Sequence, residues 1–229
     1  WHRGAVDADG KTGDGAGIHV QIPVSFFYDQ IERTGHKPKK DELMAVGQVF
    51  LPRADFGAQE TCRTIVETEV LRMGYYIYGW RHVPVKIDCL GEKANATRPE
   101  IEQILISNSK GVDEDTFERE LYVIRRRIEK SASRAGVSQL YLASLSCRSI
   151  IYKGMMLAEQ VAVFYPDLCD ERFTSSFAIY HQRYSTNTFP QWWLAQPFRM
   201  LAHNGEINTL KGNVNWMKSH EIRMASSAF

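Results

Sequence analysis

At 229 residues the chain is long enough to bury the core of one large domain or of two small ones. Its 28 basic and 27 acidic side chains leave a formal net charge of +1, which gives no support to a nucleic acid or another polyanion as a partner. No apolar run approaches the ~20 residues that span a bilayer, and no secretory signal opens the chain. We therefore expect a cytoplasmic protein with no membrane partner.

The first half of the chain alternates predicted strands with helices. A period-two pattern that ends at Pro23 and an apolar run closed by Pro52 are typical of strands. Apolar side chains at near-helical spacing before Gly74 indicate a helix that this glycine ends. In chain order we predict a strand at 18–22, a helix at 24–32, a strand at 45–51, a helix at 55–73, and strands at 75–80, 83–87 and 100–107.

The second half begins with a strongly amphipathic helix, predicted at residues 115–135. Its apolar face contains Phe117, Leu121 and Ile124, and we interpret the arginines at 125–127 as a solvated face rather than an anion site. Further on we predict paired strands at 139–144 and 149–152 around a polar turn, a helix at 155–164 and a strand at 177–183. With no internal repeat and no linker, these elements predict one α+β domain.

The four cysteines do not indicate a metal site. Cys62, Cys89, Cys147 and Cys169 form no C-x-x-C pair and have irregular spacings, which disfavours zinc and iron–sulfur ligation. Cys89 and Cys147 have apolar neighbours in the sequence, so we expect reduced, buried packing residues. Without a secretory signal, a disulfide framework is not expected.

A glycine-rich loop at residues 10–17 is the first segment that could carry chemistry. It contains Gly13, Gly15 and Gly17, as phosphate-binding loops do, but it precedes a strand and lacks the lysine of such loops. We therefore interpret it as a tight turn in which the backbone passes close to a neighbouring site.

Two later segments could bind an amino acid and its reacting amide. Arg183, with hydroxyl and amide side chains after it, could bind a carboxylate through its fork of N–H donors, although taken alone this arginine favours a surface ion pair. Asn204 and Gly205 could direct a side-chain and a backbone N–H to one point, as an oxyanion hole requires. The alternative there is a plain Asn-Gly hairpin turn.

Read together, these segments resemble the class II glutamine amidotransferases. The resemblance rests on His2-Arg3-Gly4 with the 13–17 loop, then Arg183-Tyr184-Ser185-Thr186, then His203-Asn204-Gly205, in this order. Longer strings at 3–6, 12–17, 183–190 and 194–209 resemble glutamate synthase. The resemblance implies the N-terminal-nucleophile hydrolase fold, a four-layer αββα sandwich of two antiparallel sheets between helices. It also implies that residues 1–229 are one amidotransferase domain, truncated at both ends.

The resemblance assigns four residues to the substrate. Asn204 and Gly205 would hold the oxyanion of the tetrahedral intermediate. Arg183 would bind the α-carboxylate of glutamine, and Thr186 would help to hold the same amino-acid end of the substrate.

The nucleophile of this family is an N-terminal cysteine whose own α-amine is the general base. Its thiolate attacks the glutamine amide, ammonia leaves, and water releases glutamate from the thioester. By resemblance, His203 would orient the oxyanion pair and Arg3 would support the nucleophile's pocket. This sequence begins at Trp1, reads there as the interior of a protein, and has no cysteine in the nucleophile's context. We expect the isolated chain to be inactive, and the acidic residue that contacts the substrate amine to lie beyond Phe229.

The resemblance also implies partners outside this sequence. Ammonia would pass to the remaining synthase domains of the same polypeptide and add to 2-oxoglutarate, with FMN, an iron–sulfur cluster and either a small electron-delivering subunit or ferredoxin. We expect no cofactor within these 229 residues, whose own ligand would be L-glutamine. Two alternatives stay open: another N-terminal-nucleophile amidohydrolase, which should lack the 194–209 string, or a non-catalytic domain of the same fold.

Overall fold

The computed structural model describes residues 6–39, 41–182, 189–199, 201 and 210–225. The chain divides into two units, of which the first comprises residues 1–184 and 190–202 and the second residues 185–189 and 203–229. In the second unit the described residues form helix α6 (Leu210–Glu221), none of whose side chains is buried. All other elements belong to the first unit.

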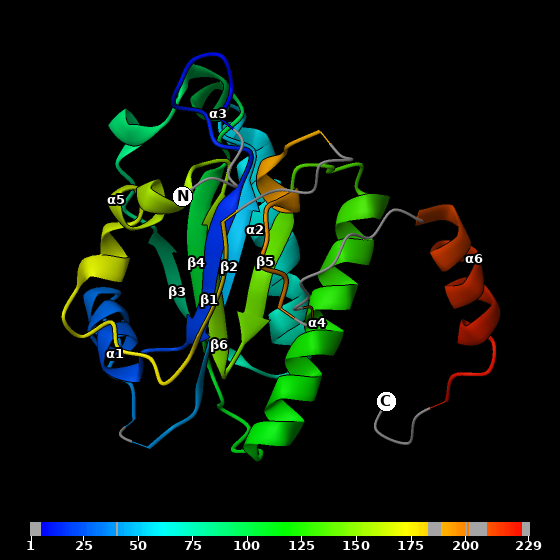
Figure 1. Ribbon diagram of the computed structural model, residues 1–229. Helices are drawn as coiled ribbons and strands as arrows, with labels where there is room; N and C mark the ends of the chain where they lie inside the picture. Colours follow the sequence, from blue (N-terminus) through cyan, green and yellow to red (C-terminus); the bar gives the residue numbers. More distant parts are fainter. Residues whose placement is uncertain (1–5, 40, 183–188, 200, 202–209, 226–229) are drawn as a thin grey trace. The chain divides into compact units, whose positions relative to one another are not determined.

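Seven strands form two antiparallel sheets (Figure 1). The strands are β1 (Ala16–Gln21), β2 (Met44–Leu51), β3 (Tyr76–His82), β4 (Glu100–Ser107), β5 (Tyr141–Ser146), β6 (Ser149–Gly154) and β7 (Ala178–His181). One sheet has the order β6–β1–β7 and the other β3–β4–β2–β5. Two antiparallel sheets with helices are the α+β architecture that the resemblance implies, so the expected fold class is confirmed.

The helices of the first unit begin and end where the sequence supplies the appropriate residues. They are α1 (Val24–Arg33), α2 (Phe56–Arg72), α3 (Glu92–Ala96), α4 (Glu114–Arg134) and α5 (Val161–Phe164), with 3₁₀ turns at Ile87–Cys89, Ala158–Gln160, Pro166–Cys169 and Trp192–Leu194. The carboxylates of Asp55 and Asp113 accept hydrogen bonds at 2.9 Å from the backbone N–H of Ala58 and Thr116, which caps α2 and α4. Gly74 follows α2 with φ +82° and ends the helix, as predicted.

Helices α2 and α4 cover the outer face of sheet β3–β4–β2–β5 (Figure 1). The spacing of apolar residues along α4 puts Phe117, Leu121 and Ile124 on one side, where they are fully buried against the sheet and α2. The opposite side of α4 is charged. There Arg125 and Arg126 pair with Glu129 of the same helix, which agrees with the predicted solvated face.

A second core fills the space between the two sheets. It contains inward-facing side chains of both, such as Val20, Phe50 and Leu105, and α1 closes it with Phe27 and Ile31.

A polar network crosses this inner core. Arg81 donates two hydrogen bonds of 2.7 Å to the carboxylate of Asp167, which also accepts from the Tyr152 hydroxyl at 2.9 Å. Gln103 links the network to Tyr152 at 2.8 Å. Because every charged member is paired and hydrogen-bonded, the network fixes how the two sheets face each other.

Three predicted elements differ in the structure. Residues 83–86 are not a strand, because Pro84 has no N–H to donate to a ladder. The strands β5 and β6 are consecutive but not paired, since β5 pairs with β2 and β6 with β1 in the other sheet. The predicted helix at 155–164 is only the 3₁₀ turn Ala158–Gln160 followed by α5.

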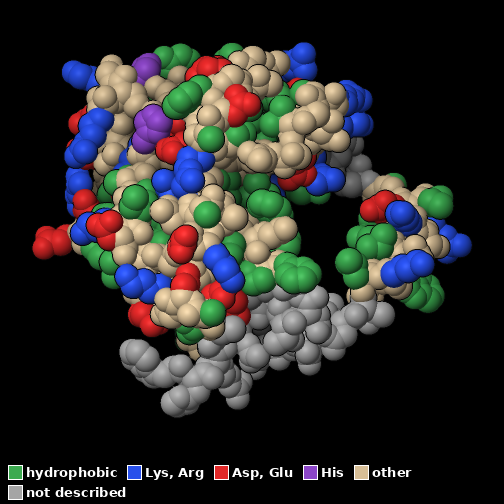
Figure 2. Space-filling view, turned by 90° about the horizontal axis from the view of Figure 1, so that it is seen from above, with side chains coloured by type: hydrophobic (Ala, Val, Ile, Leu, Met, Phe, Trp, Pro, Cys, Tyr) green, Lys and Arg blue, Asp and Glu red, His purple; other side chains and the backbone are tan. Residues whose placement is uncertain are grey.

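The surface carries mixed charge. Lys and Arg side chains are interspersed with Asp and Glu on the face seen in Figure 2, in agreement with the net charge of +1. Within the described ranges, no helix is both long enough and apolar enough to cross a bilayer.

Candidate functional site

The six predicted site residues all lie outside the described residues. They are Arg3, Arg183, Thr186, His203, Asn204 and Gly205. Described residues begin at Val6 after Arg3, end at Gln182 before Arg183, and lie on both sides of residues 202–209.

The chain segments that flank the predicted positions meet at the start of β1. Val6, three residues after Arg3, forms an antiparallel bridge with Gly13. His181, two residues before Arg183, is paired with Gly17 in the sheet. A Cβ added to Gly17 would lie 2.8 Å from the carbonyl oxygen of Gln196, in the segment that precedes residues 202–209. The segments at Val6, His181 and Gln196 are therefore brought together at residues 13–17, the last two from far along the sequence.

The glycine-rich loop is a tightly packed turn. A Cβ on Gly13 would collide with the backbone of Met156. The Asp9 carboxylate accepts from the backbone N–H of Thr12 at 2.7 Å and from the Thr12 hydroxyl, and these hydrogen bonds lower the pKa of Asp9 to about 2. The prediction of a tight turn with close backbone approach is confirmed at Gly13, where the neighbour is the Met156 backbone.

Residues 190–199, called here the connecting segment, contact β6 and also enter the inner core. The indole of Trp192 is buried in the inner core and donates from Nε1 to the Ala94 carbonyl at 3.0 Å. The Trp193 carbonyl accepts from Lys153 Nζ at 3.0 Å, and the Phe198 ring centroid lies 4.4 Å from the same Nζ. One lysine thus contacts the segment at two points.

Lys153 is a fully buried lysine on β6. Strand alternation puts Ile150 and Tyr152 into the inner core and points Lys153 to the outer face. Its Nζ also donates to the Tyr141 hydroxyl at 2.9 Å. Burial lowers the pKa of Lys153 to about 7, and the positive charge of Arg125 adds to this shift.

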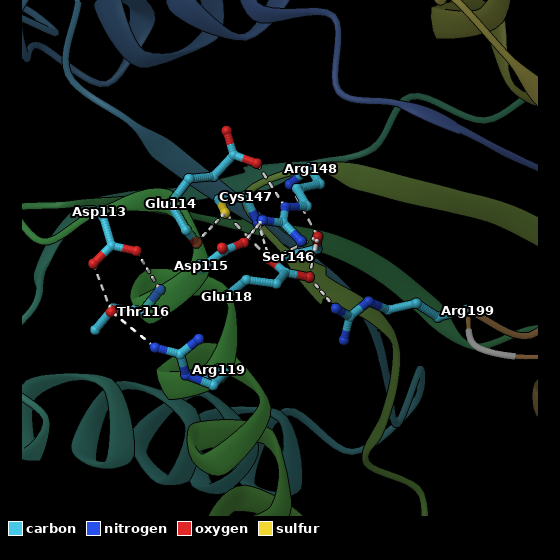
Figure 3. A network of polar contacts seen from close by, with 10 residues as sticks. All are labelled: Asp113, Glu114, Asp115, Thr116, Glu118, Arg119, Ser146, Cys147, Arg148 and Arg199. Carbon is cyan, nitrogen blue, oxygen red and sulfur yellow. Dashed lines mark hydrogen bonds and ion pairs between the residues drawn. The ribbon is translucent and has the colours of Figure 1, made fainter. Parts of the chain in front are cut away.

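Glu118 of α4 holds the other end of the connecting segment (Figure 3). Its carboxylate accepts hydrogen bonds from Ser146 Oγ at 2.8 and 3.0 Å and from the Cys147 N–H at 2.9 Å. The Arg199 guanidinium donates to the same carboxylate. Arg199 is thereby tied to a helix and to the turn between β5 and β6.

His19 faces the same side of β1 as Gly17. It is 6% exposed, its ring contacts Phe177 edge-on at 5.7 Å, and its Nε2 has no hydrogen-bond partner among the described residues. Burial, and then the charge of Arg199, lower the pKa of His19, so it is a neutral imidazole at pH 7. The face therefore combines buried polar groups with glycine.

The cysteines do not provide an activated thiolate at this face. All four are free. Burial raises the pKa of Cys62 to about 11, and burial together with the Glu118 carboxylate raises the pKa of Cys147. Cys89 and Cys147 pack against the inner and the outer core, as expected, but both are half-buried rather than buried. The Cys147 thiol also lies 3.2 Å from a Glu118 oxygen.

Among the described residues, no group of cysteines is placed to ligate an iron–sulfur cluster. In the described part of the chain, the one group of potential metal ligands is His82, Glu100 and Glu102, which contains no cysteine. Glu102 is already paired with Arg63, whose Nε donates to it at 2.9 Å.

Sequence reasoning missed Lys153, Glu118 and Arg199. A lysine inside the apolar strand at 149–154 is a visible signal, since lysine is rarely buried without a partner. Glu118 lies beside Phe117 on the apolar face of α4, but its partner is 81 residues away, which no local pattern reveals.

Comparison with known proteins supplies the context of this face. A sequence profile described as "Glutamine amidotransferases class-II" matches residues 1–229. The chain is 69% identical over 229 residues to "Glutamate synthase [NADPH] large chain" of Azospirillum brasilense, covering 100% of this chain and 15% of that protein. It is 46% identical over 226 residues to the chloroplastic ferredoxin-dependent glutamate synthase of Spinacia oleracea, covering 98% and 14%.

A third relative, "Glutamate synthase [NADPH] large chain" of Bacillus subtilis (strain 168), is 43% identical over 233 residues, covering 100% of this chain and 15% of that protein. The chain therefore spans about a seventh of the length of these curated relatives.

Proposed function

The chain belongs to the class II glutamine amidotransferases, and from this membership we propose that it is the glutaminase domain of a glutamate synthase. The reaction is hydrolysis of L-glutamine to glutamate and ammonia. The profile match over residues 1–229 supports treating the whole sequence as one such domain of a longer polypeptide.

The observation that carries the proposal is the meeting of three segments at residues 13–17. The described neighbours of Arg3 and Arg183, and the connecting segment that precedes Asn204, all contact this one stretch. A site for a small amino acid needs groups from several segments within a few ångströms of one another. This convergence supplies the frame for such a site.

Within this proposal the substrate-contacting residues have separate tasks. Arg183 pairs with the α-carboxylate through two parallel N–H donors, and Thr186 holds the same end of glutamine. Asn204 and Gly205 donate to the oxyanion that forms when the amide carbonyl is attacked.

His203 and Arg3 complete the set. His203 orients the oxyanion pair, and Arg3 supports the pocket of the nucleophile. As the family membership implies, the nucleophile is an N-terminal cysteine. Burial raises the pKa of the Cys62 and Cys147 thiols, which does not favour either as an alternative nucleophile. A chain of these 229 residues alone is therefore proposed to be inactive.

The use of the ammonia belongs to the same proposal. The relatives are named as glutamate synthases, dependent on NADPH or on ferredoxin. We propose that ammonia is passed to a synthase domain that converts 2-oxoglutarate to glutamate, with FMN and an iron–sulfur cluster held by other parts of the polypeptide and electrons arriving from a small subunit or ferredoxin. A cytoplasmic location is part of this proposal.

The decisive experiment removes one oxyanion donor. In a polypeptide in which this sequence follows the N-terminal cysteine, Asn204→Ala should lower kcat for glutamine hydrolysis by roughly 10² to 10³-fold, with KM little changed. Asn213→Ala, at an exposed position of α6, is the matched control and should leave kcat unchanged. Melting temperatures check that both variants fold. A folded Asn204→Ala variant with normal kcat would remove Asn204 from the oxyanion hole.

Arg183→Lys tests the other end of the substrate. Lysine keeps the positive charge but cannot form the bidentate pair, so KM for glutamine should rise while kcat changes less. The measurement is steady-state glutaminase kinetics in the same polypeptide. An unchanged KM would exclude Arg183 from the substrate site.

A further inference from the structure

Rigid elements of the fold hold the Glu118 carboxylate in place independently of Arg199. It lies on α4, and it accepts from the Ser146 hydroxyl and the Cys147 N–H at the turn that joins the two sheets. The thiol of Cys147 adds a third donor at 3.2 Å. With donors on both oxygens, the carboxylate has one orientation.

The partner of this carboxylate comes from an irregular part of the chain. Arg199 donates to Glu118, and the two side chains are only 11% and 10% exposed (Figure 3). The nearby Glu114 and Asp115 are instead paired with Arg148 at the surface. Burial of a charge pair far apart in sequence costs desolvation, and the hydrogen bonds from Ser146 and Cys147 offset that cost.

The connecting segment depends on side-chain anchors for its conformation. Its described backbone hydrogen bonds are local, from Leu194 and Ala195 to Gln191 and from Leu201 to Phe198, and none joins it to a sheet. The Ala94 carbonyl holds it at Trp192, Lys153 at Trp193, and Glu118 at Arg199. Of these anchors, Arg199 lies nearest in sequence to residues 202–209.

We propose that Glu118 is a positioning residue for glutamine hydrolysis, acting through Arg199 on the stretch of chain that leads to Asn204 and Gly205. This role rests on the proposed function. Glu118 does not act on the substrate itself, since its oxygens are occupied by protein donors. It fixes the chain five residues before Asn204, and an oxyanion donor displaced by about 1 Å can cost ~10²-fold in rate.

Glu118→Gln tests the role with a matched control on the same helix. Glutamine keeps the size and one acceptor oxygen but loses the charge that holds Arg199. Glu114→Gln removes an equivalent charge from an arginine pair whose Glu114 side chain is 53% exposed. In the polypeptide with an N-terminal cysteine, Glu118→Gln should lower kcat by roughly 10- to 10²-fold with KM nearly unchanged, whereas Glu114→Gln should match the wild type.

A second variant shows whether Glu118 acts through Arg199. Arg199→Gln leaves Glu118 bonded to Ser146 and Cys147, so it should fold even if Glu118→Gln does not. It should lower kcat to a similar extent, and the double variant should be no slower than Arg199→Gln alone, because both changes break one interaction. Hydrogen exchange should rise in peptides from residues 193–209 but not in α4 or β2.

The outcomes separate this role from the proposed function. A wild-type polypeptide without glutaminase activity would overturn both. An active wild type in which folded Glu118→Gln or Arg199→Gln has normal kcat would overturn only the role of Glu118. The role would also be overturned if the kcat losses of the two single variants multiplied in the double variant, or if hydrogen exchange became faster over the whole domain. Either result would make the Glu118–Arg199 pair a structural contact only.

Discussion

The two sheets have outer faces that are covered in different ways. Sheet β3–β4–β2–β5 is covered by two long helices, α2 and α4, through apolar side chains such as Val66 and Leu121. Sheet β6–β1–β7 presents Gly17, His19 and Lys153, and the irregular connecting segment lies against it. Apart from Glu118 near the start of α4, the first face stabilises the fold through apolar area, whereas the second uses buried polar groups to hold one segment in place.

The largest effect should come from the helix-covered face. Leu121→Ala removes a fully buried side chain between α4 and the sheet, and should lower the free energy of unfolding by about 2–5 kcal/mol. Leu71→Ala, at a 57% exposed position of α2, is the control and should cost far less. Urea unfolding measures both. A Leu121→Ala variant that folds but loses glutaminase kcat would break the comparison, because this face would then serve catalysis.

A smaller loss of stability, with a local displacement, is expected at the other face. A Cβ at Gly17 would lie 2.5 Å from Lys153 Cβ and 2.8 Å from the Gln196 oxygen, so Gly17→Ala must push β6 and the connecting segment apart. Such overpacking costs about 1–3 kcal/mol. Hydrogen exchange should rise in residues 191–199. The control is Gly57→Ala in α2, where the nearest atom is 3.4 Å away, and its exchange should stay at the wild-type level.

The smallest expected effect is a pH dependence of the free energy of unfolding, caused by Lys153. Lys153 has a pKa near 7 in the folded state, below its ordinary value, so between pH 7 and about 10 the unfolded chain binds the extra proton. The wild type should therefore gain stability relative to Lys153→Met as pH rises through this range, by at most about 1.4 kcal/mol per pH unit. Below pH 7 the difference should level off. Parallel unfolding curves that keep a constant separation from pH 7 to 10 would contradict a buried neutral lysine.

The regular elements were predictable because their patterns are local. The strand expected at 100–107 is β4 to the residue, and the helix expected at 115–135 is α4 within one residue. The prediction of a strand at 83–87 was wrong because of Pro84. The prediction that β5 and β6 pair with each other was also wrong, because a short turn can join strands of two different sheets as readily as strands of one sheet. Sequence periodicity reports which face is buried, not which strand lies beside it.

The candidate site was predictable only in part, for a different physical reason. Family resemblance named Asn204 and Arg183, which lie outside the described residues and stay predictions. The ion pair of Glu118 with Arg199 could not be read from spacing, because it joins a helix to a segment without regular structure. When side chains hold an irregular segment in place, the residues involved have no regular spacing, so the sequence pattern does not reveal them.

The order of strands in sheet β6–β1–β7 also determines when this part of the molecule can form during synthesis. Gly17 of β1 pairs with Lys153 of β6 and His181 of β7, so β1 leaves the ribosome long before either neighbour exists. At typical elongation rates the delay is on the order of ten seconds. During that time β2, β3 and β4 of the other sheet can already pair, and α2 can pack against them. The sheet that frames the proposed chemistry is thus assembled last, onto a helix-backed layer that has already formed.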